Sequence, residues 1–159
     1  MLVNLIVDTS AGFKSDGKAN LQRNTVRSIM SAAPKAKYSG CTMKFFAWSD
    51  SLIEVNSPDE IKFSDSVNIS SLEEFIEDLE EGSRFLLLSD GLFDPETIND
   101  ILRAKKSVLV PVAVGADSDA SVLTQIAAPN HYCFRCVNVL SALFEVCFRD
   151  FHSNSGGYQ

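Results

Sequence analysis

The feature that most constrains the fold of this chain is an apolar run that ends abruptly in an aspartate. Residues 3–7 form one such run before Asp8, and residues 85–88 form a second run shortly before Asp90. Apolar runs with little polar alternation are typical of strands that helices cover on both faces. Because the carboxyl ends of parallel strands meet at one edge of a sheet, we expect Asp8 and Asp90 to lie close together there.

The remaining sequence alternates between strand-like and helix-like periodicity. Strands are predicted at residues 2–7, 42–48, 52–55, 84–88, 108–114 and 131–135. Helices are predicted at residues 18–32, 118–127 and 139–147. Another is predicted to start at 70 or 71 and end at Gly82, and a further one to start at Asp94. A turn at residues 49–51 folds the third strand back onto the second, which makes it antiparallel and places it at an edge. The pattern predicts an α/β fold: a Rossmann-like, doubly wound, mostly parallel six-stranded sheet with one antiparallel edge strand and helices on both faces.

The sequence also predicts the cap of one helix and an irregularity in one strand. Ser70 and Ser71 stand before a helical stripe of apolar residues, and either hydroxyl is suited to cap that helix. Pro111 stands inside the strand predicted at 108–114, where it cannot donate to a neighbour. We therefore expect a bulge or an unpaired position at Pro111.

The length of 159 residues predicts one domain, and a hydrophobic content of 45% is enough for a sizeable core. We expect this domain to cover residues 1–152. The Ser, Asn and Gly residues of 153–159 predict a flexible tail.

Charge and composition exclude several classes of partner. A net charge of −7 leaves no concentrated Lys/Arg surface for a nucleic-acid backbone. No apolar run approaches the roughly 20 residues that span a bilayer, and residues 1–4 lack the basic start of a signal peptide. Four scattered cysteines favour reduced thiols over a disulfide-stapled secreted domain. We therefore expect a cytoplasmic protein with no nucleic-acid or membrane partner.

The residues at the two strand ends are suited to a hard cation. Asp8 and Ser10 offer a carboxylate and a hydroxyl in one loop, and Asp90 offers a second carboxylate. Oxygen ligands of this kind suit Mg²⁺ or Mn²⁺. Two close carboxylates repel, and either a divalent ion or a shared proton offsets the repulsion. The alternatives are a loop cap for Asp8 and Ser10 and a turn position for Asp90.

A C-x-x-C motif at Cys133 and Cys136 is a second candidate metal site. Zinc takes four ligands, and Cys147, His131 and His152 are the further candidates. Residues three apart on a strand face opposite ways, so the motif does not present both thiols to one ion. We interpret the two cysteines as packed thiols.

Several segments, taken in order and spacing, carry a family resemblance. They are Leu5 to Ser10 (LIVDTS), Phe45 to Ser49 (FFAWS), Leu87 to Gly91 (LLSDG), Val112 to Gly115 (VAVG) and Leu123 to Ala127 (LTQIA). Through them, residues 1 to about 150 resemble a von Willebrand factor A (vWA) domain, which has the fold of the integrin I domain, of the small cytosolic bacterial type.

The resemblance implies a metal-ion-dependent adhesion site (MIDAS), which combines D-x-S-x-S, a Thr from a second loop and an Asp from a third. Asp8 and Ser10 match the first two ligands, and Asp90 matches the last. Gly12 stands where the second Ser belongs, so one hydroxyl ligand is missing.

The Thr loop of the family is also absent. In its place Ser70 or Ser71 supplies a hydroxyl before the matching helix. The resemblance therefore implies an incomplete MIDAS for Mg²⁺ or Mn²⁺, with these serines added to the ligands named above.

In vWA domains an acidic residue of a partner protein completes the coordination of the metal. The resemblance thus implies a protein–protein interaction module, Mg²⁺-dependent through the partial MIDAS, that acts in a multi-protein assembly and is not an enzyme. One alternative is a metal-free, degenerate vWA scaffold that binds through helix faces or loops. Another is a Mg²⁺-dependent phosphoryl-transfer enzyme using Asp8, although the sequence has no D-x-D pattern there.

Overall fold

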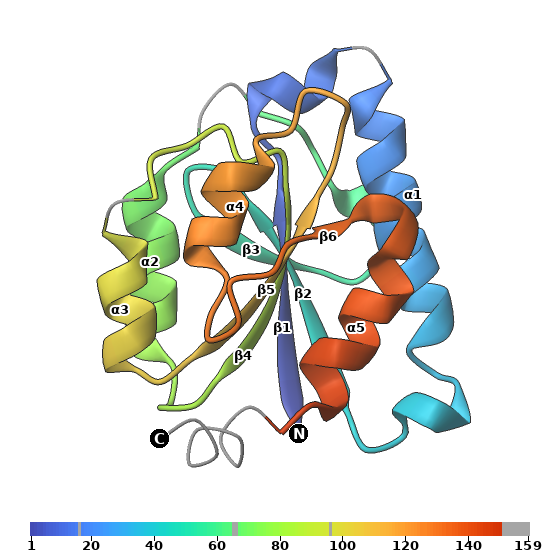
Figure 1. Ribbon diagram of the computed structural model, residues 1–159. Coiled ribbons are helices and arrows are strands. Elements are labelled where there is room, and N and C mark those ends of the chain that lie inside the picture. Colours follow the sequence, from blue (N-terminus) through green and yellow to red (C-terminus); the bar gives the residue numbers. More distant parts are fainter. Residues whose placement is uncertain (16, 65–66, 96, 151–159) are drawn as a thin grey trace.

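A six-stranded sheet forms the centre of the computed structural model, which describes residues 1–15, 17–64, 67–95 and 97–150 (Figure 1). The strands are β1 (Leu2–Asp8), β2 (Thr42–Trp48), β3 (Leu52–Val55), β4 (Arg84–Ser89), β5 (Val108–Ala113) and β6 (Phe134–Arg135). Their order is β3-β2-β1-β4-β5-β6, and among the pairings of these described strands only β2–β3 is antiparallel. The predicted fold class is confirmed. The tail predicted at 153–159 lies outside the described residues.

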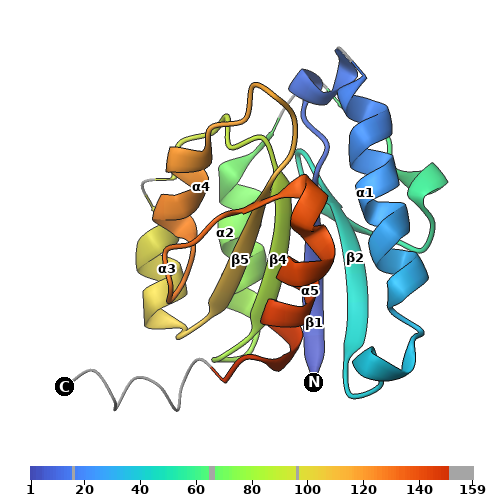
Figure 2. The same ribbon diagram turned by 45° about the vertical axis from the view of Figure 1, so that its right-hand side comes forward.

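In the part of the chain that the structure describes, five α-helices cover the two faces of this sheet. They are α1 (Lys18–Ala32), α2 (Ile69–Asp78), α3 (Ile98–Ala104), α4 (Ala120–Ile126) and α5 (Val139–Phe148). Short 3-10 turns are η1 (Ala11–Lys14), η2 (Ala36–Tyr38), η3 (Pro58–Glu60) and η4 (Cys136–Asn138). Figure 2 shows α1 and α5 on one face and α2, α3 and α4 on the other. Within the described ranges, no helix has both the length and the apolar character needed to cross a bilayer.

Alternation along the strands divides the core into two clusters. In β1, Leu5 and Val7 pack toward α1 and α5, whereas Ile6 packs toward the other three helices. Successive side chains of a strand point to opposite faces, so a strand covered on both faces must be apolar throughout. This requirement explains why the apolar runs of β1 and β4 have so little polar alternation.

The cap of α2 differs from the prediction. Asn68, not Ser70 or Ser71, caps the helix, because its Oδ1 accepts a hydrogen bond from the Ser70 backbone N–H at 2.9 Å. The Asn side chain places an acceptor two residues before that N–H, which is the usual capping geometry. The helix then ends at Asp78, before Gly82.

No bulge forms at Pro111, which corrects that expectation. Residues 108–113 of β5 pair one to one with residues 84–89 of β4. On the side away from β4, Leu109 donates its N–H to Ala128 at 2.9 Å. Alternation points the nitrogen of Pro111 to that same side, where β6 pairs only from Val112 onward. The missing donor therefore costs no hydrogen bond to β4.

Candidate functional site at the carboxyl edge of the sheet

Asp8 ends β1 as a buried carboxylate with donors on both oxygens. The residue is only 1% exposed to solvent. Oδ1 accepts from the Ser10 N–H at 2.9 Å, and Oδ2 accepts from the Ser89 hydroxyl at 2.7 Å. The Ser89 oxygen accepts in turn from the Gly91 N–H at 3.0 Å. Asp8 therefore ties the end of β1 to the end of β4.

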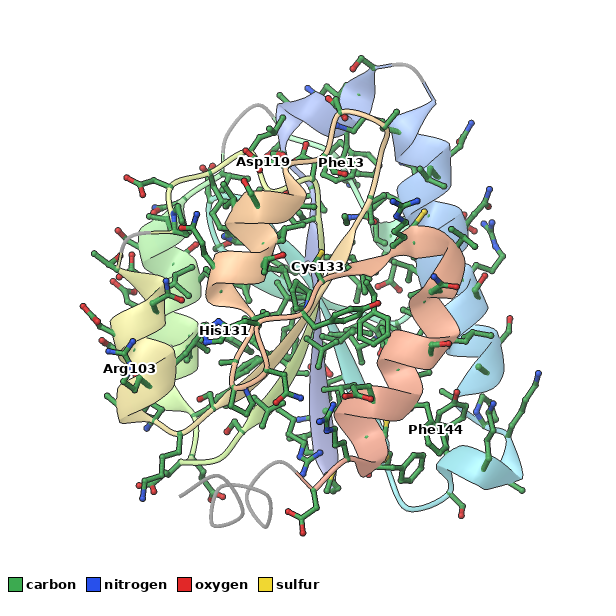
Figure 3. All side chains as sticks on the ribbon, in the orientation of Figure 1. Phe13, Arg103, Asp119, His131, Cys133 and Phe144 are labelled. Carbon is green, nitrogen blue, oxygen red and sulfur yellow. The ribbon has the colours of Figure 1, made fainter. Side chains whose placement is uncertain are left out.

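Asp90 is also 1% exposed and faces an ammonium group. Lys18, the first residue of α1, donates to Asp90 Oδ2 at 3.0 Å and pairs with Asp117 Oδ1 at 2.8 Å. The other oxygen of Asp90 accepts from the Leu92 N–H at 3.1 Å. The Lys18 nitrogen also lies 4.8 Å from the ring centre of Phe13, a favourable cation–π distance. A buried positive charge therefore sits at this edge of the sheet, which Phe13 and Asp119 mark in Figure 3.

The ion pairs outweigh the burial of the Lys18 ammonium. Burial by itself lowers the pKa of Lys18, but hydrogen bonds to Asp117 and Asp90 raise that pKa above its usual value. The same bond from Lys18 lowers the pKa of Asp117. Lys18 is therefore a permanent cation at neutral pH.

Two glycines make room for this lysine. A Cβ on Gly115 would lie 2.8 Å from Lys18 Cε, and φ at Gly115 is +100°, which disfavours any side chain. A Cβ on Gly12 would lie 3.0 Å from Asp90 Oδ2 and 3.8 Å from Lys18 Nζ. The residue that departs from the MIDAS pattern is thus small because the Lys18–Asp90 pair lies directly beside it.

The structure brings three of the five predicted site residues together. Ser10 and Asp90 line a cavity of about 420 Å³ at this edge, and Asp8 lies beneath them in hydrogen-bond contact with Ser10. Ser70 and Ser71 do not line that cavity. The Ser71 hydroxyl instead donates to the Asn68 carbonyl at 2.7 Å, inside the first turn of α2.

This donor set does not fit a divalent cation. Each oxygen of Asp8 and Asp90 already accepts one hydrogen bond, and the bond on Asp90 Oδ2 comes from the Lys18 ammonium, which stands where a metal ion would approach. The Lys18 ammonium also repels a second cation beside Asp90. Across the described ranges, no three or more His, Cys, Asp or Glu residues group in a way that could hold a metal.

Sequence reasoning missed Lys18 and Asp117. Lys18 reads as an ordinary first residue of α1, and Asp117 as a loop residue after Gly115. One signal was available, because a cation at a helix amino end opposes the helix dipole. A lysine in that position therefore indicates a compensating carboxylate nearby.

Among the described residues, Cys133 and Cys136 belong to no group of His, Cys, Asp or Glu that could hold a metal, and the candidate ligand His152 lies outside those residues. Cys133 and Cys136 are free and half-buried, and the Cys133 thiol donates to the Phe134 carbonyl at 3.4 Å. Burial raises the pKa of Cys133, and it raises the pKa of Cys147 to about 12. These groups are therefore protonated thiols at neutral pH, which disfavours nucleophilic chemistry.

The pH dependence of stability is a direct test of the Asp8 environment. Burial raises the pKa of Asp8 to about 6, against opposing hydrogen bonds from Ser89 and Ser10. Between the unfolded value of 3.8 and this folded value, the folded state binds more protons than the unfolded state, so stability falls as pH rises. We expect the free energy of unfolding of the wild type, relative to Asp8→Asn, to fall by about 2 kcal/mol from about pH 4.5 to about pH 7.5. Urea denaturation of both proteins at the two pH values measures this, and a difference that rises with pH contradicts it.

Comparisons with known proteins identify the class of fold. The sequence matches no protein-family model and no curated protein. The structure, by contrast, has the fold of vWA domains, so the resemblance is confirmed at the level of the fold.

Three solved structures illustrate this likeness. The proximal thread matrix protein 1 of the mussel byssus superposes with a TM-score of 0.66 and 18% identity over 92% of this chain and 46% of that one. The ArnB paralog VWA2 from Sulfolobus acidocaldarius superposes with a TM-score of 0.56 and 16% sequence identity, over 91% of this chain and 44% of that one. BatB from Bacteroides thetaiotaomicron superposes with a TM-score of 0.61 and 8% sequence identity, over 92% of this chain and 98% of that one. The chain thus spans less than half the length of the first two, and at these identities the likeness concerns the fold alone.

Proposed function

We propose that this chain is a protein-interaction module of the vWA type that carries a lysine ammonium where a MIDAS holds a divalent ion. One structure of the mussel byssus protein has zinc in its MIDAS motif. The observation that carries the proposal is the position of Lys18 Nζ, 3.0 Å from Asp90 and 2.8 Å from Asp117. The ammonium neutralises the buried Asp90, which is the electrostatic role of a cation at that strand end.

The internal cation changes what a partner has to offer. A metal ion keeps an open coordination position, which an acidic residue of a partner fills. The donors of Lys18 already meet two carboxylates, and the residue is only 5% exposed. An acidic anchor is therefore not required, and recognition falls to the loops around the cavity.

Those loops offer an apolar rim. Leu92 is 58% exposed at the cavity. The neighbouring Phe93 packs against the Trp48 ring, with 5.4 Å between the ring centres, and this contact holds the loop in place. An exposed leucine on a fixed loop next to a 420 Å³ hollow is suited to receive a side chain of a partner protein.

The geometry favours binding over phosphoryl transfer. A nucleophilic Asp8 needs an accessible oxygen, but the residue is 1% exposed and both oxygens accept hydrogen bonds. Among the described residues, no basic side chain forms a hydrogen bond with Asp8. The nearby cation Lys18 bonds to Asp90 and Asp117 instead.

Affinity capture with a chelator tests the proposal. We expect the wild-type chain to retain a partner equally well with Mg²⁺ and with EDTA, because no ion takes part. Leu92→Arg should reduce retention at least about tenfold, since a charge replaces an apolar rim contact. Phe144→Arg is the matched control, because Phe144 is 51% exposed on α5, away from the cavity (Figure 3). Loss of the partner in EDTA, or equal loss in both variants, contradicts the proposal.

A further inference from the structure

We infer that a second cavity, at the opposite edge of the sheet, binds a small organic oxyanion: a phosphate or carboxylate group on a compact apolar body. The cavity has a volume of about 490 Å³ and lies between α3, the start of β5 and the loop after α4. Figure 3 shows Arg103 on α3 and His131 after α4, two residues that border it. This inference does not depend on the interaction site at the carboxyl edge.

The charge of the cavity wall is opposite to that of the chain. Arg103, Lys106 and His131 line the cavity, and none of its described lining residues is Asp or Glu, although the chain has 21 acidic residues against 14 Lys and Arg. Arg103 pairs with Asp100 at 3.9 Å and Lys106 with Glu81 at 3.2 Å. All four of these side chains are more than 60% exposed, and exposed pairs of this kind are weak. The cations therefore remain able to bind an anion in the cavity.

The backbone is strained at the same place. Among the residues that the structure describes, only Lys106 and His131 combine a side chain with a left-handed φ, at 51° and 53°. Both line the cavity. Glycine adopts this conformation without strain, so the chain holds two basic residues where glycine costs less. At Lys106 the left-handed conformation closes α3, with the N–H groups of Lys106 and Ser107 bonded to the carbonyls of Arg103 and Leu102. The turns at Lys106 and His131 bring two basic residues to one cavity.

A buried hydroxyl in the cavity wall lacks a partner. Ser107 is 5% exposed, and its Oγ makes no hydrogen bond to any residue described in the structure. A buried hydroxyl without a partner is unfavourable. Because Ser107 lines the cavity, its hydroxyl is available to donate a hydrogen bond to an oxyanion there.

The remaining wall suits the apolar part of the ligand. Leu102, Val108 and Ala127 are nearly inaccessible and line the cavity together with Ala128. Apolar walls with a few convergent polar groups are the usual composition of a small-molecule site. The ligand class that satisfies both parts is a compact aryl or alkyl group bearing phosphate or carboxylate.

Calorimetric titration of the full chain with phenyl phosphate tests this inference. We expect saturable binding below about 10 mM, and binding at least about tenfold weaker for phenol and for inorganic phosphate, which each lack one half of the ligand. Benzoate in place of phenyl phosphate shows whether carboxylate or phosphate is preferred, and binding of either supports the inference. No binding of either anion, or binding of phenol as tight as that of phenyl phosphate, overturns it.

Two variants separate binding from folding. Lys106→Gly should weaken phenyl phosphate binding about tenfold while raising the thermal midpoint, because it relieves backbone strain and removes a cation. Arg103→Gln should weaken binding without changing the midpoint, since the side chain is 82% exposed. Lys37→Gln removes a charge outside the cavity and should bind like the wild type. Equal affinity in Lys106→Gly, Arg103→Gln and Lys37→Gln contradicts the inference.

Discussion

Replacing Lys18 by methionine is expected to lower the free energy of unfolding by about 3–5 kcal/mol at neutral pH. Methionine fills similar volume, so the loss comes from the charge. Without the ammonium, Asp90 keeps a buried negative charge whose side chain is 1% exposed, and removing one partner of a buried pair is much more costly than removing both. Urea denaturation followed by circular dichroism measures the change. A loss below about 1 kcal/mol would show that the pair does not stabilise the fold.

Two controls identify the cause. Lys18→Met combined with Asp90→Asn should recover most of the lost stability, because no uncompensated charge remains. Asp117→Asn should cost less than about 1 kcal/mol, since the Asp117 side chain is 58% exposed and solvent screens its charge. If Asp117→Asn costs as much as Lys18→Met, the buried Asp90 is not the source of the effect.

The same variant tests whether the lysine replaces a metal ion. In Lys18→Met the Asp90 carboxylate lacks a counter-charge, so Mg²⁺ or Mn²⁺ should raise the thermal midpoint by mass action. Neither ion should change the midpoint of the wild type. A rise in the wild type that Asp8→Ala abolishes would instead support a functional MIDAS.

Gly91→Ala is expected to destabilise the chain by about 3 kcal/mol, because the site combines an unfavourable backbone conformation with a clash. Gly91 has φ of +74°, and a Cβ there would lie 2.6 Å from the Asp119 carbonyl oxygen and 3.0 Å from Leu123 Cγ. The Asp119 N–H donates to the Asp90 carbonyl at 2.7 Å, so the clash separates the end of β4 from the start of α4.

Gly82→Ala is the matched control for this substitution. Gly82 has φ of +80°, but a Cβ there meets nothing within 4 Å. The only cost is the unfavourable backbone conformation, so we expect the free energy of unfolding to fall by about 1 kcal/mol. Thermal denaturation of the two variants side by side measures the difference, and equal losses would show that the contact with α4 contributes nothing.

The strands and helices were largely predictable because they depend on local periodicity. The boundaries of α1, β2 and β3 match the predicted ones, and the antiparallel edge strand follows from the turn at 49–51. The start of α3 was less predictable. Asp94 and Pro95 indicated an earlier beginning, but α3 begins at Ile98, and Asp94 instead lines the cavity with Leu92. Turn and helix-start signals use the same residue types, so they leave such boundaries open.

The sequence predicted that Asp8 and Asp90 lie at one edge of the sheet, because the carboxyl ends of parallel strands share an edge, and the parallel pairing of β1 with β4 brings those ends together. What stands between their loops depends on the packing of distant elements. Lys18 and Asp90 are 72 positions apart, and their contact depends on how η1 and α1 leave β1 and on the space beside Gly12 and Gly115. The pattern of residues along the chain indicates whether a segment is a strand or a helix. It does not indicate which side chains of two distant elements come into contact. The positive charge of this site was therefore present in the sequence, and its role became visible only in the fold.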